Sequence, residues 1–279
     1  MFGGGCATHK FAADGNSWAL LSDIHIAADP NLIHSQVNMT NNLRTVADEV
    51  LAWPSPISGV LVNGDLAFSS GELADYTAIL GLLRPLREHG LPVYLALGNH
   101  DNRHHCWDTL PEEKSTAAAL PERQTAIVRT SHANWFILDS LIKTLETPGQ
   151  LGDEQRAWLA RALDENADKP ALIAIHHNPM QGTVAGSSLK DTAELLAILR
   201  PRRHVKAYFF GHTHKWSVAQ DESGLWLVNF PPVAYLFEQG QPNGWVHATL
   251  QPDGTRLELR CLDRTRKDHG ETHQMTWRV

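Results

Sequence analysis

The sequence has few cysteines, and none of them is close to another. Its 279 residues contain three, Cys6, Cys106 and Cys261, and no Cys-x-x-Cys pair occurs. This pattern favours neither a disulfide framework nor a cysteine-ligated zinc site. It is typical of a protein from a reducing compartment. We therefore expect a cytoplasmic location.

Long apolar runs are absent as well. A transmembrane helix needs roughly 20 consecutive apolar residues, and no segment approaches that length, so we expect no membrane span. The residues before Asn16 lack a basic stretch followed by an apolar one, so no secretory signal is predicted. Gly3 to Cys6 faintly resembles the end of a lipoprotein signal, whose apolar part would have to lie upstream.

The charge pattern argues against duplex nucleic acid as a partner. The formal net charge is -7 and no long basic run is present, whereas proteins that bind duplex nucleic acid usually carry a basic face. A small anionic substrate remains compatible, because local cations or metal ions can override a negative average. The sequence does contain 16 histidines, which directs attention to metal-ligand spacing.

Apolar runs alternate with amphipathic stretches over the first two-thirds of the chain. The patterns predict strands at 18–21, 59–62, 92–97, 125–128, 135–138, 171–175 and 207–210, and helices at 36–53, 72–89, 153–166 and 188–199. Residues 102–122 read as an irregular loop. Strands then follow at 225–230, 245–250 and 255–262. This order predicts an α/β fold with a β-rich C-terminal part. We expect one domain over 1–279, with a core at about 17–215 and an extension at about 216–279.

Five of the apolar strands end in polar residues that bind metals. In open α/β sheets, the carboxyl ends of neighbouring strands converge on one region. Carboxylate oxygens, imidazole nitrogens and amide oxygens suit zinc, iron or manganese. The residues that follow the five strands are Asp23 and His25, then Asp65, then Asn99, His100 and Asp101, then His176 and His177, and finally His212 and His214.

These motifs resemble those of the calcineurin-like metallophosphoesterases. The matching strings are D-x-H at 23–25, G-D at 64–65, G-N-H-D at 98–101, H-H at 176–177 and G-H-T-H at 211–214. The longer strings at 21–26 and 98–103 look most like bacterial class III cyclic nucleotide phosphodiesterases, and glycerophosphodiester hydrolases are similar too. The resemblance covers about 19–214. It implies a four-layer α/β/β/α sandwich and two metal ions, Fe, Mn or Zn.

The resemblance also implies a role for each matching residue. Asp23, His25 and His214 would bind the first metal ion, and Asn99, His176 and His212 the second. Asp65 would bridge the two, since a carboxylate has two oxygens. A metal-bridging hydroxide would attack phosphorus. His100 would stabilise the transition state or protonate the leaving alkoxide, so the catalytic set is His100, Asp65 and Asn99.

The residue that follows the histidine pair departs from the pattern. Relatives often have His-His-Pro, whereas Asn178 stands before Pro179 here. Either His176 or His177 could therefore be the ligand, and we expect His176 because it directly follows the strand.

Several neighbours of the motifs have two readings. Asp101 could orient a ligand histidine or could be a helix N-cap or turn carboxylate, and Arg103 could bind phosphate or pair with acidic loop residues. His104 and His105 are expected to be solvated loop residues. Three aromatic residues could form a wall for a base or alkyl group or belong to the core: Trp216, Phe230 and Tyr235. The remaining histidines that we read as structural or surface residues are His89, His132, His204, His247, His269 and His273.

The sequence therefore predicts a phosphodiesterase acting on cyclic nucleotides or small phosphodiesters. A phosphomonoesterase or a nucleotide or lipid pyrophosphohydrolase is the alternative. A non-catalytic interaction module on the same fold is a remote one. The expected partner is a small-molecule phosphoester, and the C-terminal strands could offer an edge or apolar patch for a homodimer.

Overall fold

The computed structural model describes residues 15–114, 120–179 and 187–279. The segment around Cys6 lies outside these ranges, as does part of the predicted loop after Asn102.

The first sheet combines N-terminal and C-terminal strands. Its order is β12-β11-β10-β1-β2-β3. β1, β2 and β3 are parallel, and β10 adds to β1 in antiparallel orientation. The last three strands of the predicted β-rich C-terminal part thus extend this sheet from β1, whereas its earlier strands join the second sheet. The strands are β1 (Ser17–Leu21), β2 (Gly59–Asn63), β3 (Val93–Ala96), β10 (Gly244–Gln251), β11 (Gly254–Cys261) and β12 (Thr272–Thr276).

The second sheet is built from the middle of the chain. Its order is β4-β5-β6-β7-β9-β8. β5, β6, β7 and β9 are parallel, and an antiparallel strand closes each edge. The strands are β4 (Ala126–Arg129), β5 (Asn134–Ile137), β6 (Ala171–Ala174), β7 (Val205–Phe210), β8 (Ser217–Gln220) and β9 (Trp226–Asn229).

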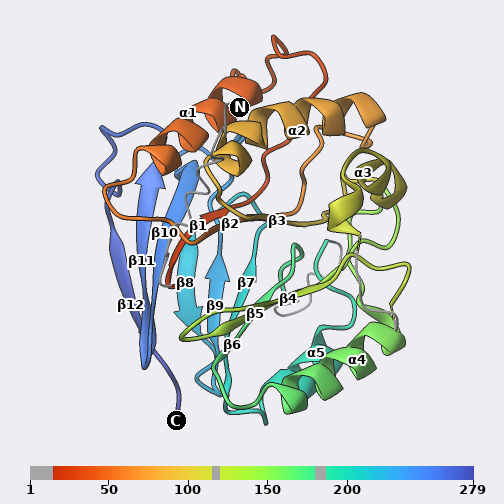
Figure 1. The fold of residues 1–279 in the computed structure, drawn as a ribbon, viewed down its shortest axis with the longest axis vertical. Coiled ribbons are helices and arrows are strands. Elements are labelled where there is room, and N and C mark those ends of the chain that lie inside the picture. The colour runs from red at the N-terminus through yellow and green to blue at the C-terminus, as the bar shows by residue number, and fades with distance from the viewer. Residues whose placement is uncertain (1–14, 115–119, 180–186) are drawn as a thin grey trace, which may run out of the picture.

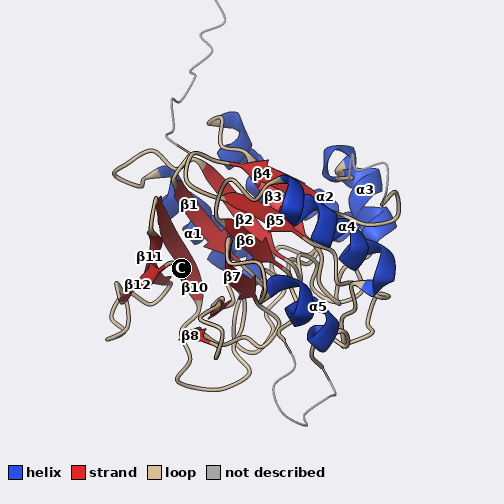
Figure 2. Cartoon of the chain, turned by 90° about the horizontal axis from the view of Figure 1, so that it is seen from below, coloured by secondary structure: helices blue, strands red, loops and turns tan. Residues whose placement is uncertain are grey.

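Helices cover the outer face of each sheet. α1 (Met39–Leu51) and α2 (Leu73–Glu88) pack on the first sheet, and α4 (Gly152–Glu165) and α5 (Thr192–Leu199) pack on the second. Figure 1 shows these two helix pairs on opposite sides of the strands, and Figure 2 shows the strands from below with α4 and α5 beside each other. The four-layer α/β/β/α fold predicted from the sequence is confirmed.

The central strands are apolar throughout because both of their faces are buried. In β1, Trp18 and Leu20 point into the layer between the two sheets, whereas Ala19 and Leu21 point toward α1 and α2. Burying side chains of this size contributes about 1.5–3 kcal/mol each. The two sheets therefore share one apolar layer, which fixes the separation of their strand ends.

Two regions differ from the prediction. The segment expected to be an irregular loop contains α3 (Arg103–Thr109) and a 3-10 turn at Pro111–Glu113, because the Asn102 side chain accepts hydrogen bonds from the amides of His104 and His105. The sequence also did not predict β8 and β12. Both are mostly exposed strands at sheet edges, so their apolar pattern is weak.

Across the described ranges, no helix is long and apolar enough to cross a membrane.

Candidate metal centre

The backbone bends sharply wherever a strand delivers a predicted ligand. Positive φ angles are uncommon outside glycine and cost about 1–3 kcal/mol each. Eight non-glycine residues in the described ranges have one, and five of them are predicted ligands. The five are Asp23, His25, Asp65, His212 and His214, with φ between 45° and 67°. Strained backbone is thus concentrated at the strand ends, where it turns side chains toward a common centre.

Hydrogen bonds tie these strand ends together. The amides of Asp23 and His25 donate to the carbonyls of Gly64 and Asp65 at 3.1 and 3.0 Å, which joins the turns after β1 and β2. The Asn63 side chain donates to the Ile175 carbonyl across the two sheets at 3.1 Å. The ends of both sheets therefore face each other over a short, fixed gap.

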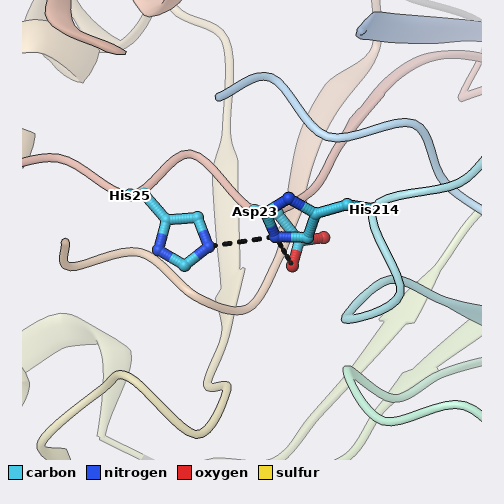
Figure 3. A group of neighbouring side chains, drawn as sticks. All are labelled: Asp23, His25 and His214. Carbon is cyan, nitrogen blue, oxygen red and sulfur yellow. Dashed lines mark hydrogen bonds and ion pairs between the residues drawn. The ribbon is translucent and has the colours of Figure 1, made fainter. Parts of the chain in front are cut away.

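The first group consists of Asp23, His25 and His214. Their ligand atoms all lie within 4.8 Å of one another, and all three side chains are buried. Nε2 of His25 lies 3.2 Å from Nε2 of His214, which in turn lies 3.4 Å from an oxygen of Asp23. Figure 3 shows the two rings directed at each other beside the carboxylate. Imidazole nitrogens facing each other at this distance suit a shared cation.

The second group consists of Asp65, His176 and His212. Their ligand atoms also lie within 4.8 Å of one another. Oδ2 of Asp65 is 3.3 Å from Nε2 of His176 and 3.6 Å from Nε2 of His25 in the first group. Asp65 thus lies between the two groups. His100 approaches the same carboxylate, since its amide donates to Oδ1 of Asp65 at 2.9 Å.

Two of the predicted ligands have a buried side-chain atom that makes no hydrogen bond with the described part of the chain. The atoms are Oδ1 of Asn99 and Nε2 of His176. A buried polar atom without a partner costs about 1–3 kcal/mol, so native structures rarely retain one without a reason. Metal coordination satisfies both atoms, because an amide oxygen and an imidazole nitrogen each offer a lone pair. The donor set therefore fits metal ions.

Backbone carbonyls fix the protonation of four histidine rings. Nδ1 of His25, His100, His176 and His214 faces the carbonyl of Phe68, Ser69, Asn63 and Tyr235, respectively. A carbonyl only accepts, so Nδ1 carries the proton and the neutral ring keeps its lone pair on Nε2. Such carbonyl contacts orient histidines that bind metals.

Burial and neighbouring charges shift the pKa values of the carboxyl and imidazole groups in the centre. Burial opposes ionisation of both carboxylates, but His176 outweighs it: the pKa of Asp23 is lowered to about 2, and that of Asp65 lies well below its usual range. Burial also disfavours the charged form of His176, yet Asp65 and Asp23 raise its pKa to about 9. Burial lowers the pKa of His25 and His212 to about 4. Two ionised carboxylates buried in one centre thus favour positive charge beside them, which suits the binding of metal ions.

His176 and His177 differ in their hydrogen-bond partners. Both ring nitrogens of His177 have partners, with Nδ1 at 2.7 Å from the Ser140 hydroxyl and Nε2 at 3.0 Å from the Thr147 carbonyl. The Thr147 carbonyl requires a proton on Nε2, so Nδ1 accepts from Ser140. Neither nitrogen is free for a metal ion, whereas Nε2 of His176 is.

Asp101 and Arg103 each make several hydrogen bonds that hold neighbouring segments together. Asp101 is fully buried and accepts from the amides of Leu66, Ala67 and Gly98. It is therefore a turn carboxylate and not the cap of α3, which is Asn102. It holds together the two turns that carry Asp65 and Asn99. Arg103 donates two hydrogen bonds to buried Asp139, so it pairs with an acid and does not face the centre.

Aromatic residues border the first group. The Tyr235 ring lies 5.0 Å from both His25 and His214, whereas Phe230 stacks on Phe209 in the core. Trp216 also packs against the layer between the sheets. Sequence reasoning missed His34 and Phe237, which lie against Tyr235 and His214. Neither belongs to a motif or a periodic stretch, so only the folded chain reveals them.

Comparison with known proteins identifies the family. A sequence model of the calcineurin-like phosphoesterases matches residues 18–216. The chain belongs to this family. It is therefore a phosphoester hydrolase whose clustered carboxylates and histidines form a candidate two-metal site. The expected family and enzyme class are confirmed.

Curated relatives align over most of the chain. It is 28% identical over 251 residues to a 3',5'-cyclic adenosine monophosphate phosphodiesterase CpdA from Pseudomonas aeruginosa, covering 85% of this chain and 86% of that one. The CpdA of Haemophilus influenzae is 24% identical over 255 residues, or 87% and 88% of the two chains. A glycerophosphodiester phosphodiesterase GpdQ from Enterobacter lignolyticus is 22% identical over 72% of each.

The fold is also shared with a solved structure. A dimetal phosphatase from Danio rerio superposes with a TM-score of 0.74 at 15% identity, covering 95% of this chain and 100% of that one. At this identity the match concerns the fold alone.

Proposed function

We propose that this family member is a phosphodiesterase that cleaves cyclic nucleotides or small phosphodiesters at a two-metal site. The single observation that carries the two-metal assignment is the position of Asp65 between two groups of ligand atoms, 3.6 Å from His25 and 3.3 Å from His176. The phosphodiesterase assignment is supported by relatives bearing that name, which align over 85% to 88% of this chain.

In this proposal the first group binds one metal ion, and His176, His212 and Asn99 bind the other, with Asp65 shared. Iron, manganese and zinc all suit such a mixed set of nitrogen and oxygen donors. When bound, the two ions supply Lewis acidity, which lowers the pKa of water and withdraws charge from phosphoryl oxygens.

His100 has the geometry of a group that handles a proton. One of its ring nitrogens lies within 4.8 Å of the ligand atoms of His25 and Asp65, and its side chain is partly exposed. Because Nδ1 donates to the Ser69 carbonyl, Nε2 is the atom left to carry a second proton. The imidazolium would then donate to a phosphoryl oxygen or to the leaving alkoxide.

A substrate panel tests the proposal. The protein, loaded with manganese, is assayed with cyclic AMP, bis(4-nitrophenyl) phosphate and 4-nitrophenyl phosphate. We expect a higher kcat/KM for the two diesters. A large preference for the monoester would contradict the proposal and favour a phosphomonoesterase.

His100→Asn tests the proton-handling step in the same panel. Asparagine cannot carry the second proton, so kcat should fall by about 100-fold or more while metal content stays at the wild-type level. A fall in metal content would instead assign His100 to metal binding.

A further inference from the structure

An exposed aromatic ring lies directly on the first group of ligands. Phe237 is 62% exposed, yet its ring is nearly parallel to that of His214, with centroids 3.9 Å apart and an interplanar angle of 10°. One face of the phenyl ring thus covers a predicted metal ligand, and the opposite face is left to solvent. Burying the exposed part of this ring under a flat ligand group would be favourable, because apolar surface would leave water.

The backbone that carries this ring is anchored to the metal centre. The amides of Val233 and Ala234 donate to the carbonyls of Ser22 and Asp23 at 2.9 and 3.0 Å. The carbonyl of Tyr235 accepts from Nδ1 of His214 at 2.6 Å. Phe237 is therefore only two residues from a hydrogen bond to the centre. A ring placed in advance loses little conformational entropy when a ligand binds.

Two more rings continue from Phe237, and Tyr235 among them is buried. Tyr235 lies 5.9 Å from Phe237 and 4.6 Å from His34, centroid to centroid. We call His34, Tyr235 and Phe237 the aromatic wall. Its ring contacts with the metal centre are to His25 and His214 of the first group. The second group is bordered by His177, which is fully buried and whose ring nitrogens are both hydrogen-bonded.

The aromatic wall favours esters that carry a flat aromatic group. A nucleobase or aryl group gains about 1–3 kcal/mol from stacking on an aromatic side chain, whereas a glycerol or ethanolamine group has no flat face to offer. The wall lies beside the first group, which would hold a metal ion next to the phosphoryl group. The exposed Phe237 ring is thus an aromatic surface beside the place where the ester would react.

We propose that Phe237 is a specificity-determining residue that stacks on the flat aromatic group of a phosphodiester substrate. This inference rests on the proposed phosphodiesterase function. It adds that the enzyme discriminates by the aromatic character of the ester group, and it names the side chain responsible.

The test compares three diesters in three variants. Cyclic AMP, bis(4-nitrophenyl) phosphate and glycerophosphoethanolamine are assayed with the manganese-loaded full chain carrying Phe237→Ala, Phe237→Trp or Leu73→Ala. Leu73 is another exposed apolar residue, at the start of α2, and serves as the matched control. Metal content and AMP binding by calorimetry are measured for each variant.

We expect Phe237→Ala to raise KM for the two aromatic diesters by about 5- to 100-fold, the range that corresponds to one base stack. Its kcat, its metal content and its KM for glycerophosphoethanolamine should stay at wild-type levels. AMP should bind more weakly by a similar factor. Phe237→Trp should restore both KM and AMP binding, and Leu73→Ala should match the wild type. An effect on the aryl diester alone supports stacking of a simple aryl group and not of a nucleobase.

Two results would overturn the inference. One is an equal change for all three diesters together with unchanged AMP binding. The other is loss of metal from Phe237→Ala, which would make the ring a support for His214 and nothing more. If the wild type cleaves none of the diesters, the proposed function fails, and AMP binding still decides the role of Phe237.

Discussion

The first and second groups are the two halves of the centre, and they have different surroundings. The first group faces the aromatic wall, whose Phe237 is mostly exposed, whereas the second group lies against fully buried His177. A ligand can therefore reach a side chain beside the first half, whereas the second half is bordered by a buried polar side chain. If each half binds a metal ion as proposed, recognition of the ester group would fall to the side of the first half, with Asp65 as the residue common to both halves.

Replacing Asp65 should have the largest effect, because it removes the feature that the halves share. We expect Asp65→Asn to lower the content of both metal ions and to reduce kcat/KM by at least about 1,000-fold, or about 4 kcal/mol of transition-state stabilisation. Metal analysis and steady-state kinetics measure both. Full metal content with wild-type activity would show that the two groups do not form one centre.

Two glycines allow each half to be disturbed alone. A methyl group on Gly64 would lie 2.5 Å from Nδ1 of His176, and one on Gly211 would overlap Ser22 and the Asp23 carboxylate. We expect Gly64→Ala to weaken metal binding in the second group and Gly211→Ala in the first. Each should reduce activity by about 10- to 100-fold, as the loss of ligand orientation does elsewhere.

The control for this pair is Gly81→Ala in α2, where a methyl group meets no atom within 4 Å. It should leave activity unchanged and stabilise the fold by about 0.5–1 kcal/mol. If Gly64→Ala and Gly211→Ala lose the same metal ion, the division into halves is wrong.

A smaller effect is expected when His177, which borders the second group, is replaced. His177→Phe keeps an aromatic ring beside His212, 4.8 Å from it in the native protein, but leaves the Ser140 hydroxyl and the Thr147 carbonyl without their partner. We expect about a 10-fold loss of metal affinity with no change in the ratio of KM values for aromatic and alkyl diesters. A change in that ratio would mean that the second half also contributes to recognition.

Replacing His247, a buried histidine outside both halves, should have the smallest effect. Burial lowers the pKa of His247 to about 4, and its Nε2 lies 2.9 Å from the Ser17 hydroxyl. The unfolded chain takes up this proton near pH 6.5, so the contribution to stability is complete above that pH and is lost as pH falls toward about 4.

Thermal melts between pH 7 and 4 should therefore show a smaller loss of Tm for His247→Gln than for the wild type. Activity at pH 7 should be unchanged in the variant. Parallel curves for the two proteins would contradict the assignment of a neutral, buried His247.

The convergence of the predicted ligand residues could be anticipated from sequence because two local signals coincide. An apolar run identifies a buried strand, and a polar residue directly after it must lie at the strand end, as with Asp23 after β1 and Asp65 after β2. The family motifs then supply the order of the residues. Within each sheet, parallel strands bring their own ends together, and the packing of the two sheets brings the two sets of ends together.

The surroundings of the centre could not be predicted, because they depend on pairings between distant segments. His34 and Phe237 lie about 200 residues apart and meet only through Tyr235. Arg103 has two readings in the sequence, and only the buried position of Asp139 decides between them. The partners of His177 come from a connecting segment without periodicity. Side-chain recognition thus depends on tertiary packing that short patterns do not encode.

The left-handed residues at the strand ends have a consequence for folding. Five of them, at about 1–3 kcal/mol each, represent a free energy comparable to the whole stability of an ordinary domain, about 5–15 kcal/mol. Ions that bind only the folded chain add stability in proportion to the logarithm of their concentration. We expect Tm to rise with added manganese and to fall with a chelator, so that the supply of metal would govern how much of this protein remains folded.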